Sequence, residues 1–209
     1  MAAPPARAGG KRRLVRAALR LSARKRSFTA LGVRELGRAA GLNPNTFYRH
    51  FRSLDELGLA IIGEITADLR NALREIRRSA ARPADSAART VRFFFDFVRR
   101  NPDAFLIAGR ELHGASPVMR RALRDVLAEM AADMAEDVRA IGLVPGVDDT
   151  ALEQVTAAIV RHMFYLSLDY LEHPKERRAI VEQAIDFILM LSAGAMALHG
   201  ITIESPPRR

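Results

Sequence analysis

The sequence predicts an all-helical protein that begins with a helix-turn-helix domain. Nearly half of the 209 residues are apolar and charged residues are plentiful, whereas tryptophan is absent. This composition fits a helical protein better than a sheet. Apolar residues recur at helical spacing along almost the whole chain, and no segment alternates apolar and polar residues as a half-buried strand does.

The first expected helix is basic and amphipathic. It follows a lead that contains Pro4, Pro5, Gly9 and Gly10, a composition typical of disorder. The apolar and basic residues that recur at helical spacing are Leu14, Ala17, Ala18 and Leu21, among Arg12, Arg13, Arg16 and Arg20.

The next two expected helices are short and separated by a tight turn. The first covers residues 33–40 and ends at Gly41, where a glycine fits the left-handed backbone of a helix end. Asn43 then provides an N-cap, and Pro44 provides the first residue of a helix to His50. Helix, glycine turn and short helix form the layout of a helix-turn-helix.

A long fourth helix is expected to connect two domains. Ser53 and Glu56 form a capping box that opens a helix to about residue 79. Turn residues beyond it separate five further expected helices, at about 84–100, 103–112, 117–141, 149–172 and 175–199. We therefore predict a DNA-binding domain at 1–55 and a helical ligand-binding and dimerisation domain at 56–209.

The excess positive charge lies in the first quarter of the chain. Residues 1–55 hold 13 basic and 2 acidic side chains, a balance of +11, whereas residues 56–209 hold 20 and 22, a balance of −2. A basic segment joined to a near-neutral body is typical of a nucleic-acid-binding module with a second domain. Charge alone is equally compatible with a solvated basic tail.

The helix-turn-helix resembles a known family. Residues 31–36 (LGVREL) and 40–51 (AGLNPNTFYRHF) resemble the DNA-binding signature of the TetR repressors. Residues 47–51 followed by 55–59 are similar, more narrowly, to the FabR/DesT branch, which represses unsaturated-fatty-acid synthesis and desaturation. The resemblance covers residues 11–60. It implies a homodimeric repressor that binds double-stranded DNA at a palindromic operator.

The expected DNA contacts lie in and beside the second helix of the motif. The set is Asn43, Asn45, Thr46, Tyr48, Arg49, His50 and Arg52. Asparagine and threonine side chains at the start of a recognition helix can meet base edges or adjacent phosphates. The resemblance implies that Tyr48 and His50 reach the DNA backbone, and the arginines add positive charge. Many family members carry a lysine where this chain has Leu54, so one common phosphate contact is missing.

Phe47 and Phe51, four residues apart in the same segment, are expected to be core residues that hold the short helix on its scaffold.

The second domain is expected to bind an apolar effector. Its phenylalanines at 93–95 and 97 point around most of helix 84–100, so we expect protein on all sides of that helix. The candidate ligand-binding residues are Phe94, Phe97, Arg110, His113, Met130, Met134, Arg161 and His162. Ordinary core packing is the alternative for each. Together with the resemblance, they predict a tunnel for a long acyl chain, as acyl-CoA; a drug or another metabolite is the alternative effector.

The last two helices are expected to form a dimer interface. Their apolar faces are wider than one domain of this size needs, and small residues at 192–195 allow close helix approach. A second copy would complete a four-helix bundle. The candidate interface residues are Leu166, Phe187, Leu191 and Ala195.

Several functions are not expected. The absence of cysteine excludes disulfides, thiolate metal sites and cysteine nucleophiles. No phosphate loop, nucleophile elbow, zinc-protease motif or dinucleotide fingerprint is present, and the five histidines lack metal-ligand spacing. We expect no enzyme activity, cofactor or membrane span, and a cytoplasmic location. The rival interpretations are a basic helical module that binds RNA or acidic membrane, and an unrecognised helical enzyme.

Overall fold

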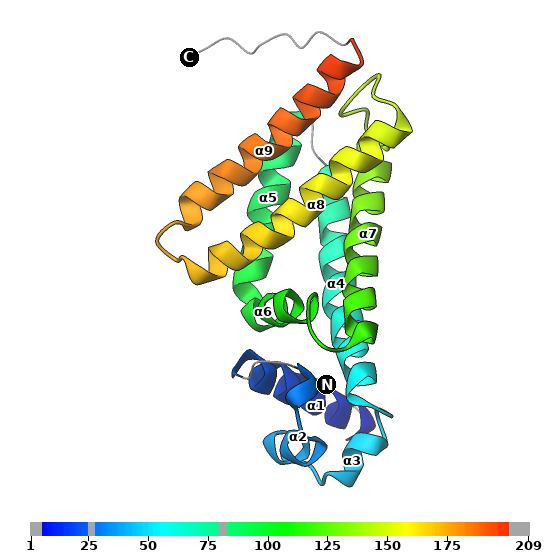
Figure 1. Ribbon diagram of the computed structural model, residues 1–209, viewed down its shortest axis with the longest axis vertical. Helices are drawn as coiled ribbons and strands as arrows, with labels where there is room; N and C mark the ends of the chain where they lie inside the picture. The colour runs from blue at the N-terminus through cyan, green and yellow to red at the C-terminus, as the bar shows by residue number, and fades with distance from the viewer. Residues whose placement is uncertain (1–5, 25–27, 80–82, 201–209) are drawn as a thin grey trace. The chain divides into compact units, whose positions relative to one another are not determined.

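The computed structural model describes residues 6–24, 28–79 and 83–200, and all regular structure in these ranges is helical. The elements are α1 (Ala6–Arg24), the short 3-10 helix η1 (Phe28–Ala30), α2 (Val33–Ala39), α3 (Asn45–Tyr48), α4 (Leu54–Arg78), α5 (Pro83–Arg100), α6 (Pro102–Glu111), α7 (Pro117–Ala140), α8 (Asp149–Glu172) and α9 (Arg177–Leu198) (Figure 1). The all-helical class predicted from the sequence is confirmed.

The start of α1 corrects one expectation. Gly9 and Gly10 lie inside the helix rather than in a disordered lead, and residues 1–5 lie outside the described ranges. Gly10 is buried, and a Cβ there would lie only 2.8 Å from His50 Nε2. Glycine therefore allows α1 to pass close to this side chain, a tertiary contact that helix propensity does not reveal.

The chain folds into two compact units. Unit 1 comprises residues 1–67 and 101–125, and unit 2 comprises residues 68–100 and 126–209. Helices α4 and α7 each contribute to both units. The boundary predicted at residue 55 divides the chain by function and not by compactness, and it stays a prediction.

The core of unit 1 brings α6 together with the helix-turn-helix. The buried core residues are Leu14, Ala17, Ala18, Phe28, Leu31, Leu36, Ala40, Phe47, Phe51, Leu57, Ile61 and Ile107. The buried carboxylate of Glu111 accepts a hydrogen bond from the backbone N–H of Phe28 at 2.6 Å. Arg110 Nη1 donates to the carbonyl of Ser22 at 3.0 Å. Helix α6 therefore supports α1 and η1.

Unit 2 is built around α5, α8 and α9, with α8 and α9 lying side by side (Figure 1). Phe94 and Phe95 are buried, and the ring centroids of Phe95 and Tyr170 lie 4.7 Å apart. The opposite face of α5 carries the exposed residues Arg92, Asp96 and Arg99. The expectation that protein surrounds α5 is therefore wrong. Phe94 and Phe95 are buried in the core, whereas Phe93 and Phe97 are only half-buried.

Candidate nucleic-acid interface

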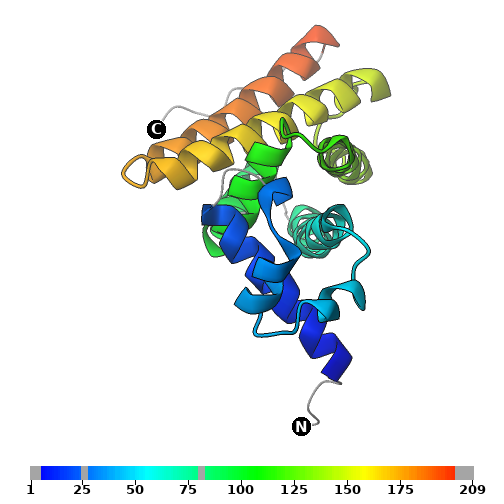
Figure 2. The same cartoon turned by 60° about the horizontal axis from the view of Figure 1, so that its bottom comes forward.

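The turn between α2 and α3 has the backbone predicted from Gly41. This glycine has φ +62°, the left-handed conformation that other residues rarely adopt. Its N–H donates to the carbonyl of Arg38 at 3.0 Å, and the N–H of Leu42 donates to the carbonyl of Gly37 at 2.8 Å. These bonds end α2 and redirect the chain toward α3 (Figure 2, blue to cyan).

Asn43 makes the hydrogen bond expected of a capping residue. Its Oδ1 accepts from the backbone N–H of Asn45 at 3.0 Å. Pro44 already has helical angles, φ −50° and ψ −35°, although the helix as defined by its hydrogen bonds begins at Asn45. The short helix therefore starts one residue later than expected, and its start is held by the predicted side chain.

The two faces of α3 differ as the sequence predicts. Phe47 and Phe51 are 0% and 3% exposed and their ring centroids lie 5.8 Å apart, so the predicted core role of both is confirmed. Tyr48 is 64% exposed. The remaining candidate DNA contacts divide into exposed residues, Asn43, Asn45, Arg49 and Arg52, and half-buried residues, Thr46 and His50. These seven side chains stay predicted DNA contacts.

The start of α4 carries a modified capping box. Ser53 Oγ accepts from the N–H of Glu56 at 3.1 Å, as predicted. The Glu56 carboxylate accepts from the N–H of Arg52 at 2.6 Å, one residue before the capping serine. The segment between α3 and α4 is thereby fixed in place, which restrains the backbone of Arg52.

The candidate ligand-binding residues divide between the two units. Arg110 and His113 belong to unit 1, where Arg110 is bonded to Ser22 and His113 is exposed. Those in unit 2 are Phe94, which is buried, Phe97, Met130, Met134 and His162, which are half-buried, and Arg161, which is exposed. Arg161 Nε donates to the carbonyl of Ala157, on its own helix.

Two buried polar atoms in unit 2 lack a partner. His162 Nε2 and Thr90 Oγ1 are buried and have no hydrogen bond within the described part of the chain. The His162 ring packs against Phe187 in a tilted arrangement, with 4.0 Å between centroids and 39° between the ring planes. Sequence reasoning missed Thr90, although a hydroxyl next to three phenylalanines on one helix was a usable signal. Among the described residues, no cluster of three or more histidine or acidic side chains could hold a metal ion.

The candidate dimer residues differ in accessibility. Leu166 and Ala195 are buried within the protomer, and Phe187 and Leu191 are half-buried. The exposed large apolar side chains of α8 and α9 are Tyr165, Leu189, Met190 and Leu198. By length and composition alone α9 could cross a membrane, and 22% of its most apolar window is buried inside the protomer. Hydrophobic periodicity identified α8 and α9 as apolar helices. It did not show which of their faces pack against α5.

A helix-turn-helix whose turn is made by Gly41, in a basic N-terminal segment followed by a longer helical region, is the arrangement of a DNA-binding regulator. Residues 14–61 match the family model described as "Bacterial regulatory proteins, tetR family". Residues 83–191, more than half of the chain, match "Tetracyclin repressor-like, C-terminal domain". The chain therefore belongs to the TetR family of transcriptional regulators, which are not enzymes.

Solved structures agree with this fold. A TetR-family regulator from Streptomyces coelicolor is 19% identical with TM-score 0.69, covering 95% of this chain and 87% of that one. The fatty acid degradation regulator FadR from Bacillus halodurans is 14% identical with TM-score 0.73, covering 90% and 97%. FadR from Thermus thermophilus, a repressor solved in complex with lauroyl-CoA, is 22% identical with TM-score 0.62, covering 95% and 99%.

Proposed function

We propose that this protein is a homodimeric cytoplasmic repressor of the FabR/DesT type, and that a long-chain acyl-CoA changes its affinity for a palindromic operator. The genes under its control would be those of fatty acid desaturation. The observation that carries the effector proposal is the pair of unpartnered polar atoms, His162 Nε2 and Thr90 Oγ1, on the aromatic helices of unit 2. Buried polar atoms are nearly always bonded, so an unpaired one suggests an absent ligand or water.

DNA binding is proposed to use the exposed side of α3. Asn45 offers a donor and an acceptor for a base edge, and Tyr48 offers a hydroxyl for a phosphate. The buried Phe47 anchors the helix from the opposite side. We assign the operator-binding function to residues 1–55 and effector binding and dimerisation to residues 56–209.

Dimerisation is proposed to use α8 and α9. Tyr165 of α8 and Met190 of α9 are 50% and 65% exposed, so both leave apolar side-chain surface uncovered in the protomer. A second copy would cover it and form a four-helix bundle. Two recognition helices would then meet two half-sites roughly 34–36 Å apart, one turn of DNA.

The acyl chain is proposed to lie among the aromatic and methionine side chains of unit 2. Phe94, Phe97, Met130 and Met134 are the candidates for its walls, and His162 or Thr90 could donate to the thioester carbonyl. Arg161 is a weaker candidate, because a backbone carbonyl of its own helix already accepts a hydrogen bond from its guanidinium group, and Arg110 and His113 belong to unit 1. The lauroyl-CoA bound to the Thermus thermophilus FadR supports the ligand class only as a distant analogy.

The test is calorimetric titration of the full chain with acyl-CoAs of increasing length and unsaturation, in parallel with operator binding. Burial of each methylene contributes about 0.8 kcal/mol, so affinity should rise about fourfold per methylene until the proposed acyl-chain site is full. Free CoA is the control for the headgroup. One acyl chain must also change operator affinity, because a ligand that binds both conformations equally shifts neither.

Paired variants separate the polar contacts from simple packing. Thr90→Val keeps the shape of the side chain and removes the hydroxyl, so acyl-CoA affinity should fall while stability is kept or increased. His162→Phe keeps a ring against Phe187 and removes the nitrogens. If no acyl-CoA of any length binds, the effector is a drug or another metabolite.

A binding experiment can distinguish the proposed repressor from the rival interpretation, a basic helical module that binds RNA or acidic membrane. A basic module would bind any duplex, RNA or acidic vesicle with similar affinity. A repressor binds its operator more tightly than unrelated DNA, by a factor of about 10³ or more in affinity. Selection of bound fragments from a genomic DNA pool, with anionic vesicles and RNA as competitors, measures this ratio.

A further inference from the structure

Two arginines of α1 reach the end of α2. Arg13 Nε donates to the carbonyl of Ala40 at 2.9 Å, and its Nη2 donates to the carbonyl of Gly41. Arg20 Nη2 donates to the carbonyl of Ala39 at 3.3 Å. Three consecutive carbonyls at the end of α2 thus accept hydrogen bonds from guanidinium groups of α1.

The geometry and the charge of a helix end explain the positions of these bonds. The last carbonyls of a helix have no partner within the helix, and a positive group is favourable beside the negative end of its dipole. Gly41 eases the approach, since a Cβ there would lie 3.1 Å from Arg13 Nη2 and the guanidinium would have to shift slightly. Glycine therefore allows the left-handed turn and also relieves a tight contact with the guanidinium.

The same region holds a third arginine that does not take part. A pocket of about 410 Å³ is lined by Arg13, Arg16, Leu19, Arg20, Ala39, Ala40 and Asp103. Arg16 is exposed, and among the described residues it has no hydrogen-bond or ion-pair partner. It thus matches Arg13 and Arg20 in charge, helix and location but not in bonding.

We infer that Arg13 and Arg20 are positioning residues for DNA binding, which fix the turn before α3 by holding the last carbonyls of α2 and do not neutralise phosphates. This inference rests on the DNA-binding role of α3 proposed above. The turn at residues 40–44 leads directly into α3, so its conformation sets the direction in which Asn45 and Tyr48 point. When only a fraction of the molecules has the competent conformation, apparent affinity falls by that fraction.

The inference separates the basic charge of the N-terminal segment into two kinds. An arginine that neutralises a phosphate releases a counterion on binding, and its loss lowers the slope of log affinity against log salt by about 0.9. A positioning arginine changes the affinity and leaves that slope unchanged. The salt slope therefore distinguishes the two roles even when both variants bind more weakly.

The experiment compares Arg13→Gln, Arg20→Gln and Arg16→Gln in the full chain. Each variant removes one positive charge from α1. We expect Arg13→Gln to weaken operator binding by about tenfold with the parent's salt slope, because it removes the two hydrogen bonds of a solvent-exposed guanidinium. Arg20→Gln should have a smaller effect, because it loses one longer bond. Arg13→Lys should recover part of the affinity, since an ammonium can reach one carbonyl but lacks the guanidinium fork.

Hydrogen exchange in the DNA-free protein tests the positioning role without an operator. Arg13→Gln should speed exchange at the amides of Leu42 and Thr46 by about tenfold while amides of unit 2 keep the parent rates, and Arg16→Gln should not. If Arg13→Gln unfolds unit 1, Arg20→Gln provides the same comparison with a milder change.

Three results would contradict the positioning role, and a fourth would instead refute the proposed function. Unchanged exchange at the turn, parent-like operator affinity, or a salt slope lowered by about 0.9 would each overturn the inference. Faster exchange in a protein whose parent selects no operator would support the positioning contact and refute the proposed function instead.

Discussion

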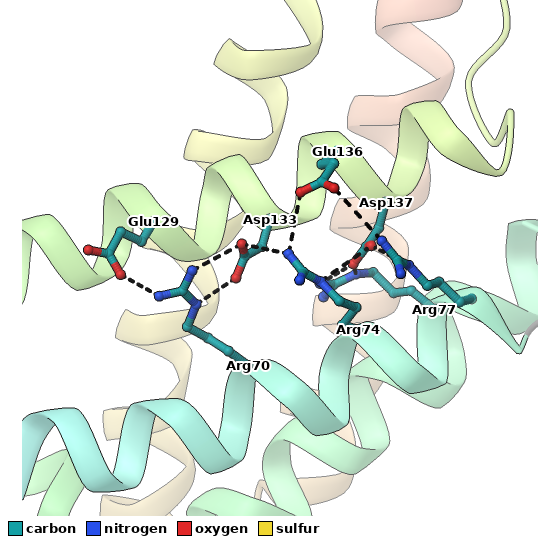
Figure 3. Close-up of polar contacts among 8 residues, drawn as sticks. Arg70, Arg74, Arg77, Glu129, Asp133, Glu136 and Asp137 are labelled. Carbon is teal, nitrogen blue, oxygen red and sulfur yellow. Dashed lines mark hydrogen bonds and ion pairs between the residues drawn. The ribbon is translucent and has the colours of Figure 1, made fainter.

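Arg77 donates two hydrogen bonds to one carboxylate oxygen of Asp137, from Nε at 2.9 Å and from Nη2 at 2.7 Å, and both side chains are buried (Figure 3). Arg78 Nε donates to the other oxygen at 2.9 Å. Within unit 2, this carboxylate is the buried end of a row of ion pairs between α4 and α7. Further along the row, Arg70 and Arg74 contact Asp133 at 2.5 and 2.9 Å.

The first prediction concerns this buried pair. Asp137→Ala leaves the Arg77 guanidinium buried without its partner, so we expect a loss of about 3–5 kcal/mol in the free energy of unfolding. Urea denaturation followed by circular dichroism measures it. The control is Asp96→Ala, which breaks an exposed pair with Arg99 and should cost no more than about 1 kcal/mol. Equal losses in the two variants would contradict the prediction.

The second prediction is a pH dependence at Asp133. The hydrogen bond from Arg70 holds the pKa of Asp133 below its ordinary value, outweighing burial, and the charges of Arg70, Arg74 and Arg77 act in the same direction. A depressed carboxyl pKa contributes stability above the unfolded pKa of about 3.9 and loses it as pH falls through the folded value.

Asp133→Asn should therefore be less stable than the parent at neutral pH, and the difference should shrink below about pH 4. Urea midpoints of both proteins from neutral to acidic pH measure this. A difference that stays constant into acid would show that the carboxylate charge is not its source.

The third prediction concerns the exposed face of α3. Asn45→Ala should change which operator sequences are preferred, whereas Tyr48→Phe should weaken operator and non-specific duplex alike, because a backbone contact reads no sequence. The Tyr48 hydroxyl carries no charge, so the salt slope should stay constant, while Arg52→Gln should lower it by about 0.9. Anisotropy titrations on matched duplexes measure these effects. If all three bound the operator like the parent, α3 would not be the recognition helix.

The fourth prediction concerns the second copy. The parent should sediment as a dimer at micromolar concentration, and Met190→Asp should yield a folded monomer, because Met190 is 65% exposed in the protomer. Leu191→Asp should also prevent dimerisation, with some loss of stability, since that side chain is half-buried. Gln183→Asp, an exposed polar position on α9, is the control. A monomeric parent would contradict the interface.

The sequence by itself determined the features that obey local rules. Gly41 predicted a left-handed turn, Ser53 and Glu56 predicted a helix start, and the four-residue spacing of Phe47 and Phe51 predicted a buried face. Each of these signals operates within a few residues, through backbone angles, capping hydrogen bonds or helical periodicity. For the same reason the sequence predicted which phenylalanines of this segment would be buried, whereas the DNA contacts predicted in and beside α3 stay predictions.

Only the tertiary structure decided the contacts between residues far apart in the chain. The bond between Phe28 and Glu111 places α6 in the unit that holds the helix-turn-helix. The carbonyls bound by Arg13 lie in the turn that follows α2, far from Arg13 in the sequence, so sequence charge alone could not separate this arginine from Arg16. Gly10 lies within α1 at a point where the helix passes so close to His50 that a Cβ would clash with it. Hydrophobic periodicity states that a side chain needs a partner, and the packing of the whole chain determines which partner it meets.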